Sequence, residues 1–86
     1  MEQYQLMNNH DVIAFGDYYE GKKYADEHNL KEAEYGDVYG SKLSYCYFNK
    51  TGNRYDDEDV IIYYRFGRDG KPQPISDEEL RNYLFN

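Results

Sequence analysis

The sequence predicts a small α+β domain in which two short helices cover one face of a mainly antiparallel sheet. Three observations carry this prediction: the length of 86 residues, two helix starts marked by capping residues, and several aromatic-rich runs separated by turn sequences. A chain of this length forms one domain and buries about 60% of the surface that its unfolded form exposes. We therefore expect residues 1–86 to form a single compact unit without a linker.

The composition indicates a core that is packed with tyrosine. Only 16 of the 86 residues are Leu, Ile, Val or Phe, and in a charged chain such a fraction is typical of disorder. Twelve tyrosines reverse that conclusion, because a Tyr ring buries a large apolar area while its hydroxyl stays hydrated or hydrogen-bonded.

The first elements in the chain are a hairpin and a helix. Residues 4–7 and 12–15 are β-compatible runs, and residues 8–11 between them tolerate turn conformations. Asp17, with Glu20 three residues later, forms a capping-box pattern that starts a helix over residues 18–28.

That helix ends in a recognisable way. Asn29 can adopt the left-handed conformation that follows a helix, and Leu30 can then fold back onto the last turn. Gly21 lies inside the helix and lowers its intrinsic stability by up to about 1 kcal/mol relative to Ala.

The middle of the chain reads as strands separated by turns. Residues 32–39 alternate polar and apolar side chains with a shift at Gly36, which predicts a β-bulge there. Residues 43–48 and 60–66 are aromatic-rich strands that we expect to pair. Both faces of 60–66 carry apolar side chains, so this strand is either covered on both sides or presents an outward patch that binds something.

The end of the chain predicts a hairpin and a second helix. Asp69-Gly70 is a hairpin signal, and Pro72 and Pro74 confine the returning segment to a sheet edge or to no sheet. Ser76 then caps a helix, with Glu79 completing the capping box.

The apolar residues of this second helix have assigned places. Ile75 and Leu80 form a hydrophobic staple at its start, and Leu80, Tyr83 and Leu84 make a buried stripe along it.

The sequence contains no pattern typical of catalysis or metal binding. Cys46 lies within a predicted strand, where a packing role is favoured over a thiolate activated by His10 or His28. A calcium loop that begins at Asn49 fails, because its sixth residue is Arg54 rather than Gly. We therefore expect no enzyme activity, no cofactor and no metal.

The balance of charge bears on partners. There are 17 acidic and 10 basic residues, which give a formal charge of −7 and argue against direct nucleic-acid binding. No 18-residue apolar run and no secretion signal are present, so we expect a cytoplasmic chain that does not bind membranes. The sequence leaves the oligomeric state open.

Acidic and tyrosine residues are the candidates for partner binding. Glu32 and Glu34, alternating on one strand face, would lie roughly 6.6 Å apart, about twice the 3.4 Å rise per phosphate of one DNA strand. The acidic run of residues 56–59 could extend this row, and Tyr39 and Tyr55 are candidate exposed anchors. The alternative for the run is a solvated loop or a loose calcium site at Asp56, Asp57 and Asp59. The full candidate set is Glu32, Glu34, Tyr39, Tyr55, Asp56, Asp57, Glu58 and Asp59.

These observations favour one function and leave two alternatives. The favoured function is a small acidic, tyrosine-rich protein-binding module, an inhibitor that docks on the basic, nucleic-acid-binding surface of a partner protein. Immunity proteins and phage or plasmid anti-defence proteins share this profile by analogy only. The first alternative is a structural or regulatory domain without an inhibitory role, and the less favoured second is an enzyme.

Overall fold

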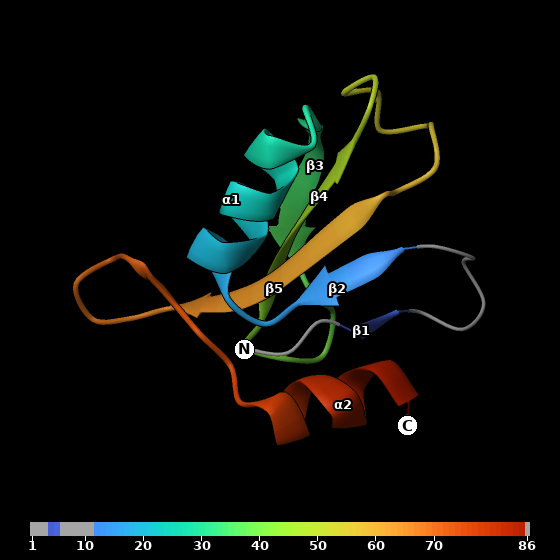
Figure 1. Ribbon diagram of the computed structural model, residues 1–86. Helices are drawn as coiled ribbons and strands as arrows, with labels where there is room; N and C mark the ends of the chain where they lie inside the picture. The colour runs from blue at the N-terminus through green and yellow to red at the C-terminus, as the bar shows by residue number, and fades with distance from the viewer. Residues whose placement is uncertain (1–3, 6–11, 86) are drawn as a thin grey trace.

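The computed structural model describes residues 4–5 and 12–85, which form strands and helices in the predicted order. The elements, shown in Figure 1, are β1 (Tyr4–Gln5), β2 (Ile13–Phe15), α1 (Tyr18–Glu27), β3 (Lys31–Asp37), β4 (Ser44–Asn49), β5 (Val60–Phe66), β6 (Pro72–Gln73) and α2 (Asp77–Phe85). The α+β class is confirmed. No helix in the described ranges is long and apolar enough to cross a membrane.

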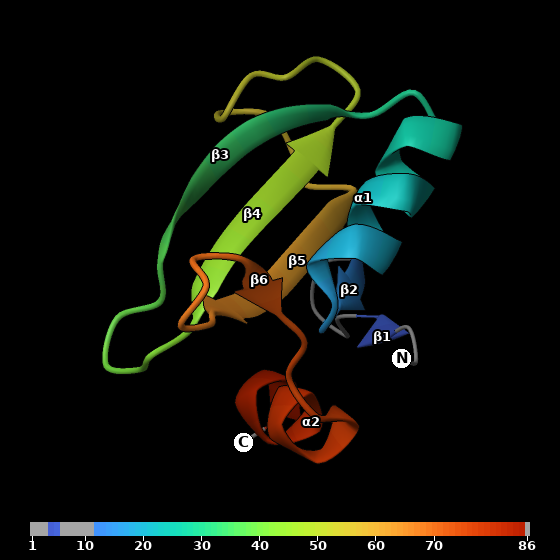
Figure 2. The ribbon, with the colours of Figure 1, turned by 90° about the vertical axis from the view of Figure 1, so that its left-hand side faces the viewer.

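The strands lie side by side in the order β1-β2-β5-β4-β3, and β6 pairs with the end of β5 (Figure 2). Neighbouring strands are antiparallel except β2 and β5, which are parallel. The predicted pairing of residues 43–48 with 60–66 is confirmed, with a register that runs from Ser44 opposite Tyr64 to Phe48 opposite Val60. β5 is therefore a central strand, and β3 is an edge strand.

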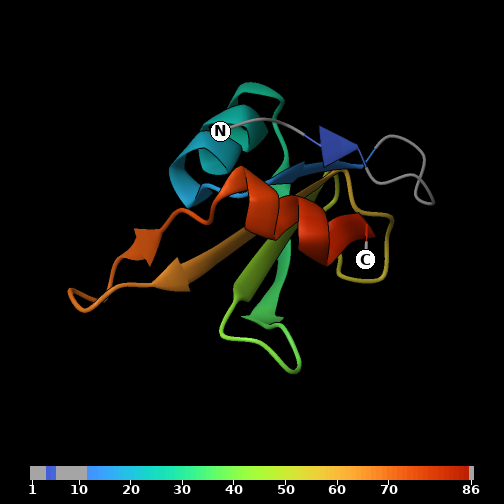
Figure 3. The same ribbon diagram turned by 90° about the horizontal axis from the view of Figure 1, so that it is seen from below.

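The two helices lie on opposite faces of this sheet, so the prediction that both cover one face is wrong. Ile62 and Tyr64 of β5 belong to the apolar cluster under α1, whereas Ile61 and Tyr63 belong to the cluster under α2. Figure 1 shows the helices on different sides, and Figure 3 shows α2 in front of the sheet. The reason is that a central strand with apolar side chains on both faces needs cover on both.

Both ends of α1 are formed as the sequence predicts. The Asp17 carboxylate accepts hydrogen bonds from the backbone N–H groups of Tyr19 and Glu20, at 2.9 and 3.2 Å. Asn29 has a φ of 57°, and the N–H of Leu30 donates to a carbonyl in the last turn at 2.9 Å. Local capping chemistry therefore sets the limits of this helix.

The bulge in β3 lies three residues before the predicted position. The register shifts between Glu32, which is opposite Phe48, and Glu34, which is opposite Tyr47, whereas Gly36 follows regular pairing. Phe48 and Tyr47 point to opposite faces of β4. The extra residue in the bulge therefore places the two glutamates on opposite faces of the sheet.

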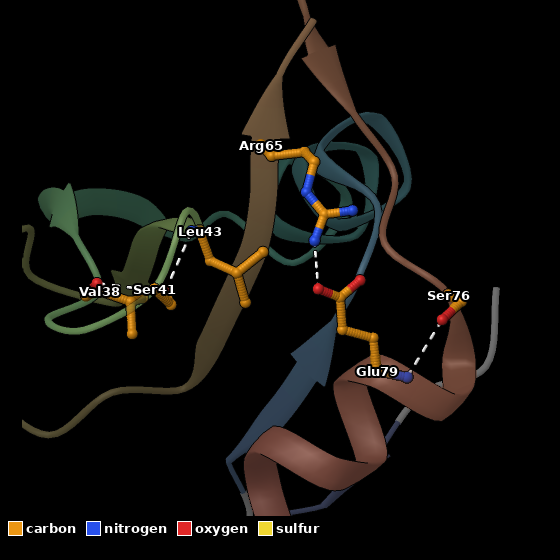
Figure 4. A network of polar contacts seen from close by, with 6 residues as sticks. All are labelled: Val38, Ser41, Leu43, Arg65, Ser76 and Glu79. Atoms are coloured by element: carbon orange, nitrogen blue, oxygen red, sulfur yellow. Dashed lines mark hydrogen bonds and ion pairs between the residues drawn. The ribbon is translucent and has the colours of Figure 1, made fainter.

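The second helix is joined to the sheet by polar and apolar contacts. The Ser76 hydroxyl accepts a hydrogen bond from the N–H of Glu79 at 3.1 Å, and the Arg65 guanidinium of β5 pairs with the Glu79 carboxylate (Figure 4). Ile75 and Leu80 are buried in one cluster, which confirms the staple. Tyr83 was predicted to be buried but is 43% exposed, because it packs edge-on against Tyr63 at the limit of the covered area.

The two predicted hairpins are present where the structure describes them. β1 and β2 pair antiparallel, whereas the turn between them and His10 lie outside the described residues. At the second hairpin Gly70 has a φ of 76°, and the N–H of Gly67 donates to the carbonyl of Lys71 at 2.9 Å. Pro72 lies in β6, which pairs only with β5, so its confinement to a sheet edge is confirmed.

Candidate protein-binding groove

A hollow of about 340 Å³ lies on the α2 side of the sheet, over β3, β4 and β5. Its walls combine tyrosine rings with carboxylates, and we call it the tyrosine groove. It is lined by Glu34, Asp37, Val38, Tyr39, Tyr45, Tyr47, Glu58, Ile61, Tyr63 and Tyr83.

Strand alternation and the position of α2 create this groove. Tyr45 and Tyr47 alternate along β4, and Tyr45 is directly opposite Tyr63 of β5. α2 packs against β5 through Tyr83 and Tyr63, whereas β3 and β4 extend away from α2 in Figure 2. Tyr83 at the end of α2 forms one wall, with its ring centroid 4.9 Å from that of Tyr63 and the rings inclined by 63°.

The carboxylates carry the negative charge of the groove. Burial, followed by the charge of Glu34, raises the pKa of the Tyr45 and Tyr47 hydroxyls. Burial, then the neighbouring Tyr83 and Glu58, raises the pKa of Tyr63. These phenols are therefore neutral at physiological pH, and the charge of the groove comes from its carboxylates, Glu34, Asp37 and Glu58.

The surroundings of Glu34 and Glu58 decide whether these two carboxylates can accept a cation, and Glu34 interacts there with the hydroxyls of Tyr45 and Tyr47. Both glutamate side chains are half-buried, and in residues 4–5 and 12–85 neither forms an ion pair with Lys or Arg. Asp37, which also lines the groove, accepts a hydrogen bond from the Ser44 hydroxyl at 3.2 Å. Glu34 and Glu58 are consequently the groups available to an incoming cation.

The bulge in β3 separates the two acids of the predicted row, although both line one hollow at this edge strand. Glu34 faces the tyrosine groove, whereas Glu32 lies on the α1 face, where its charge acts on Cys46 and Tyr18. The bulge between them inverts the alternation on which the row depended. The regular alternation from which the phosphate-like spacing was inferred is therefore interrupted at this point.

The acidic run after β4 is divided among different environments. Asp56 and Asp57 are exposed, and Asp56 accepts a hydrogen bond from the Thr51 hydroxyl at 2.6 Å. Glu58 and Asp59 are half-buried rather than exposed, because the chain here turns into β5. Glu58 lines the tyrosine groove, and Asp59 lines a separate hollow beside α1.

The two candidate tyrosine anchors are both exposed, as the sequence predicts, but only one belongs to the groove. Tyr39 lies in a turn where the Ser41 hydroxyl donates to the carbonyl of Val38 and accepts from the N–H of Leu43 (Figure 4). Tyr55 lies outside the groove, and the Arg54 guanidinium lies over its ring, 5.1 Å from the ring centroid.

Cys46 has the environment of a packing residue. Its side chain is 1% exposed, and burial, followed by the Glu32 carboxylate, raises the pKa of the thiol to about 12. The thiol is therefore protonated at physiological pH. Among the described residues, no three His, Cys, Asp or Glu side chains form a group that could hold a metal ion.

Sequence reasoning missed four tyrosines of the groove: it assigned Tyr45, Tyr47 and Tyr63 to the strands and Tyr83 to a buried stripe. One signal in the sequence could have indicated them. Tyr45 and Tyr47 are two residues apart on one strand, and Tyr63 lies on the strand that pairs with it. What was not visible in the sequence is that α2 leaves this face uncovered.

Comparison with known proteins adds no relationship. No family model matches the chain, and neither a curated protein nor a solved structure matches it.

Proposed function

We propose that the chain is a small protein-binding module that docks on a basic surface of a partner through the tyrosine groove. Where that surface holds nucleic acid, the docked module inhibits the partner by occupying it. The observation that carries this proposal is the placement of Glu34 and Glu58 among tyrosine rings around one hollow.

Tyrosine chemistry supports a protein interface. Tyr offers a large contact area with few rotatable bonds, and it is enriched where proteins meet. Tyr47 and Tyr63 are buried and give the groove a fixed floor, whereas Tyr39 and Tyr83 expose their rings at its margin. A partner can therefore bury these rings without disturbing the core.

The charge distribution supports a basic partner. Removing a carboxylate from water is costly unless an opposite charge or hydrogen bonds replace the water. A cationic group from a partner would supply this for Glu34 and Glu58. Asp56 and Asp57 outside the groove add attraction that reaches about 8 Å at physiological ionic strength and mainly raises the association rate. The proposal includes no catalytic role, because the Cys46 thiol is buried and protonated.

The test starts with affinity capture from the cells that contain the protein, followed by binding kinetics on each captured protein. Three forms are compared: the unchanged chain, Glu58→Gln in the groove, and Glu27→Gln as a control with the same change of charge at an exposed position of α1. We expect Glu58→Gln to slow association and weaken its salt dependence, while Glu27→Gln leaves binding close to that of the unchanged chain.

A partner that binds all three forms with equal rates would contradict docking at the groove. The inhibitory role is tested separately by measuring nucleic-acid binding to the captured partner with and without the chain. Nucleic-acid binding that continues at the same affinity in the complex would refute inhibition and favour the alternative of a regulatory or structural domain.

A further inference from the structure

We infer that the tyrosine groove binds the guanidinium group of an arginine side chain presented by the partner. This inference rests on the proposed function and names the chemical group that the groove recognises. Its basis is the combination of tyrosine rings at different inclinations with two carboxylates, Glu34 and Glu58, that form no ion pair among the described residues.

The groove favours a cation for two separate reasons. Glu34 and Glu58 both act on the Tyr47 hydroxyl, which places both carboxylates near the same part of the groove. The faces of tyrosine rings also attract a cation that lies within about 6 Å of the ring centroid. A neutral group would leave both carboxylates without an opposite charge, and an anion would be repelled by them.

Arginine suits this groove better than lysine. Its planar guanidinium can stack on one ring while its edges donate hydrogen bonds to carboxylates, and it is less strongly hydrated than an ammonium group. Tyr83 packs at 63° against the buried Tyr63 and is itself 43% exposed, so its ring offers a face on which the guanidinium plane can stack. A lysine ammonium would have to lose more of its water to enter among these rings.

The chain itself contains an arginine on a tyrosine next to the groove. The Arg54 guanidinium lies over the Tyr55 ring at 5.1 Å, and its charge also lowers the pKa of Tyr45, against the dominant effect of burial. Arg54 forms no ion pair with Glu34 or Glu58 within the part of the chain that the structure describes. Arg54 and Glu34 line a second hollow at this edge of the sheet without reaching ion-pair distance, so among the described residues both groove carboxylates remain open to an arginine from outside.

The inference is tested with the full chain and three capped five-residue peptides. Each peptide has glycine at four positions and arginine, lysine or citrulline at the centre; citrulline has the shape of arginine without its charge. Binding is followed by NMR through the ring signals of the tyrosines. We expect saturable shifts at Tyr45, Tyr63 and Tyr83 with the arginine peptide, weaker binding of the lysine peptide, and no saturable binding of the citrulline peptide.

Variants locate the binding within the groove. Glu34→Gln or Glu58→Gln should lower the affinity for the arginine peptide by about two- to fivefold, which is the range for a half-exposed ion pair. Tyr83→Phe should keep the affinity because the ring face remains, whereas Tyr83→Leu should lower it. Glu27→Gln on α1 serves as the control and should leave the affinity unchanged.

Different results separate this inference from the proposed function. Equal binding of the three peptides, or shifts outside the groove, would overturn the arginine assignment even if a captured partner still loses affinity with Glu58→Gln. If the groove binds the arginine peptide selectively but the captured partner binds Glu58→Gln as well as the unchanged chain, the arginine site is supported and docking of the partner through it is refuted.

Discussion

Replacing Gly21 by Ala should destabilise the protein, although Ala is the better helix former. A Cβ atom at this position would lie 2.5 Å from Cγ1 and 2.8 Å from Cδ1 of Ile62, and 3.2 Å from Cβ of Phe15. Favourable contacts between carbon atoms have separations of about 3.5–4.0 Å. Either α1 must move away from the sheet by close to an ångström, or Ile62 must leave its rotamer.

Two opposing free energies decide the result. Ala gains up to about 1 kcal/mol over Gly from helix propensity, whereas overpacking a core costs about 1–3 kcal/mol. The upper part of that range applies because Ile62 is fully buried and cannot turn toward solvent. We expect a net loss of about 1–2 kcal/mol in the free energy of unfolding, and each kcal/mol lowers Tm by about 4–8 °C in a domain of this size.

Urea denaturation followed by circular dichroism and tyrosine fluorescence measures this change. Lys23→Ala, at an exposed position of the same helix, is the control and should change the stability by no more than about 0.5 kcal/mol. If Gly21→Ala proves as stable as the unchanged protein or more stable, the close packing of α1 on β5 is wrong.

Three further predictions follow from single residues. The Cys46 thiol should react slowly with a thiol reagent in the native protein. Its pKa in the folded protein is about 12, above the ordinary value of 9.0. The stability that the buried thiol contributes is therefore complete below pH 9 and is lost as the pH rises toward 12. The stability difference between the unchanged protein and Cys46→Ala should therefore fall by up to about 1.4 kcal/mol per pH unit above pH 9, and a constant difference would refute this. Ser76→Ala should lower the free energy of unfolding by about 1 kcal/mol in urea denaturation, because it removes the hydrogen bond that the Ser76 hydroxyl accepts from the N–H of Glu79. Ser76→Asp should leave the free energy of unfolding unchanged, because a carboxylate can accept the same hydrogen bond. Glu34→Gln should slow association with a captured partner in surface plasmon resonance and Glu32→Gln should not, since the bulge separates them; equal effects would show that both faces take part.

Much of the local structure was determined by the sequence because its signals act over a few residues. A side chain at Asp17 or Ser76 reaches backbone N–H groups two or three positions away, and that interaction is the same in any tertiary context. Asn29 and Gly70 likewise adopt positive φ angles for local reasons. The helices, the hairpin at Gly70 and the strand over 60–66 were therefore predictable.

The tertiary structure alone decided which side chains meet. The parallel pairing of β2 with β5 makes β5 central, and two apolar faces then take one helix each; no local signal records this long-range pairing. The bulge between Glu32 and Glu34 carries no glycine, and one extra residue exchanges the faces of a strand whose side chains alternate. The tyrosine groove depends on both, because it exists where β3 and β4 extend past α2 with Glu34 on the uncovered face.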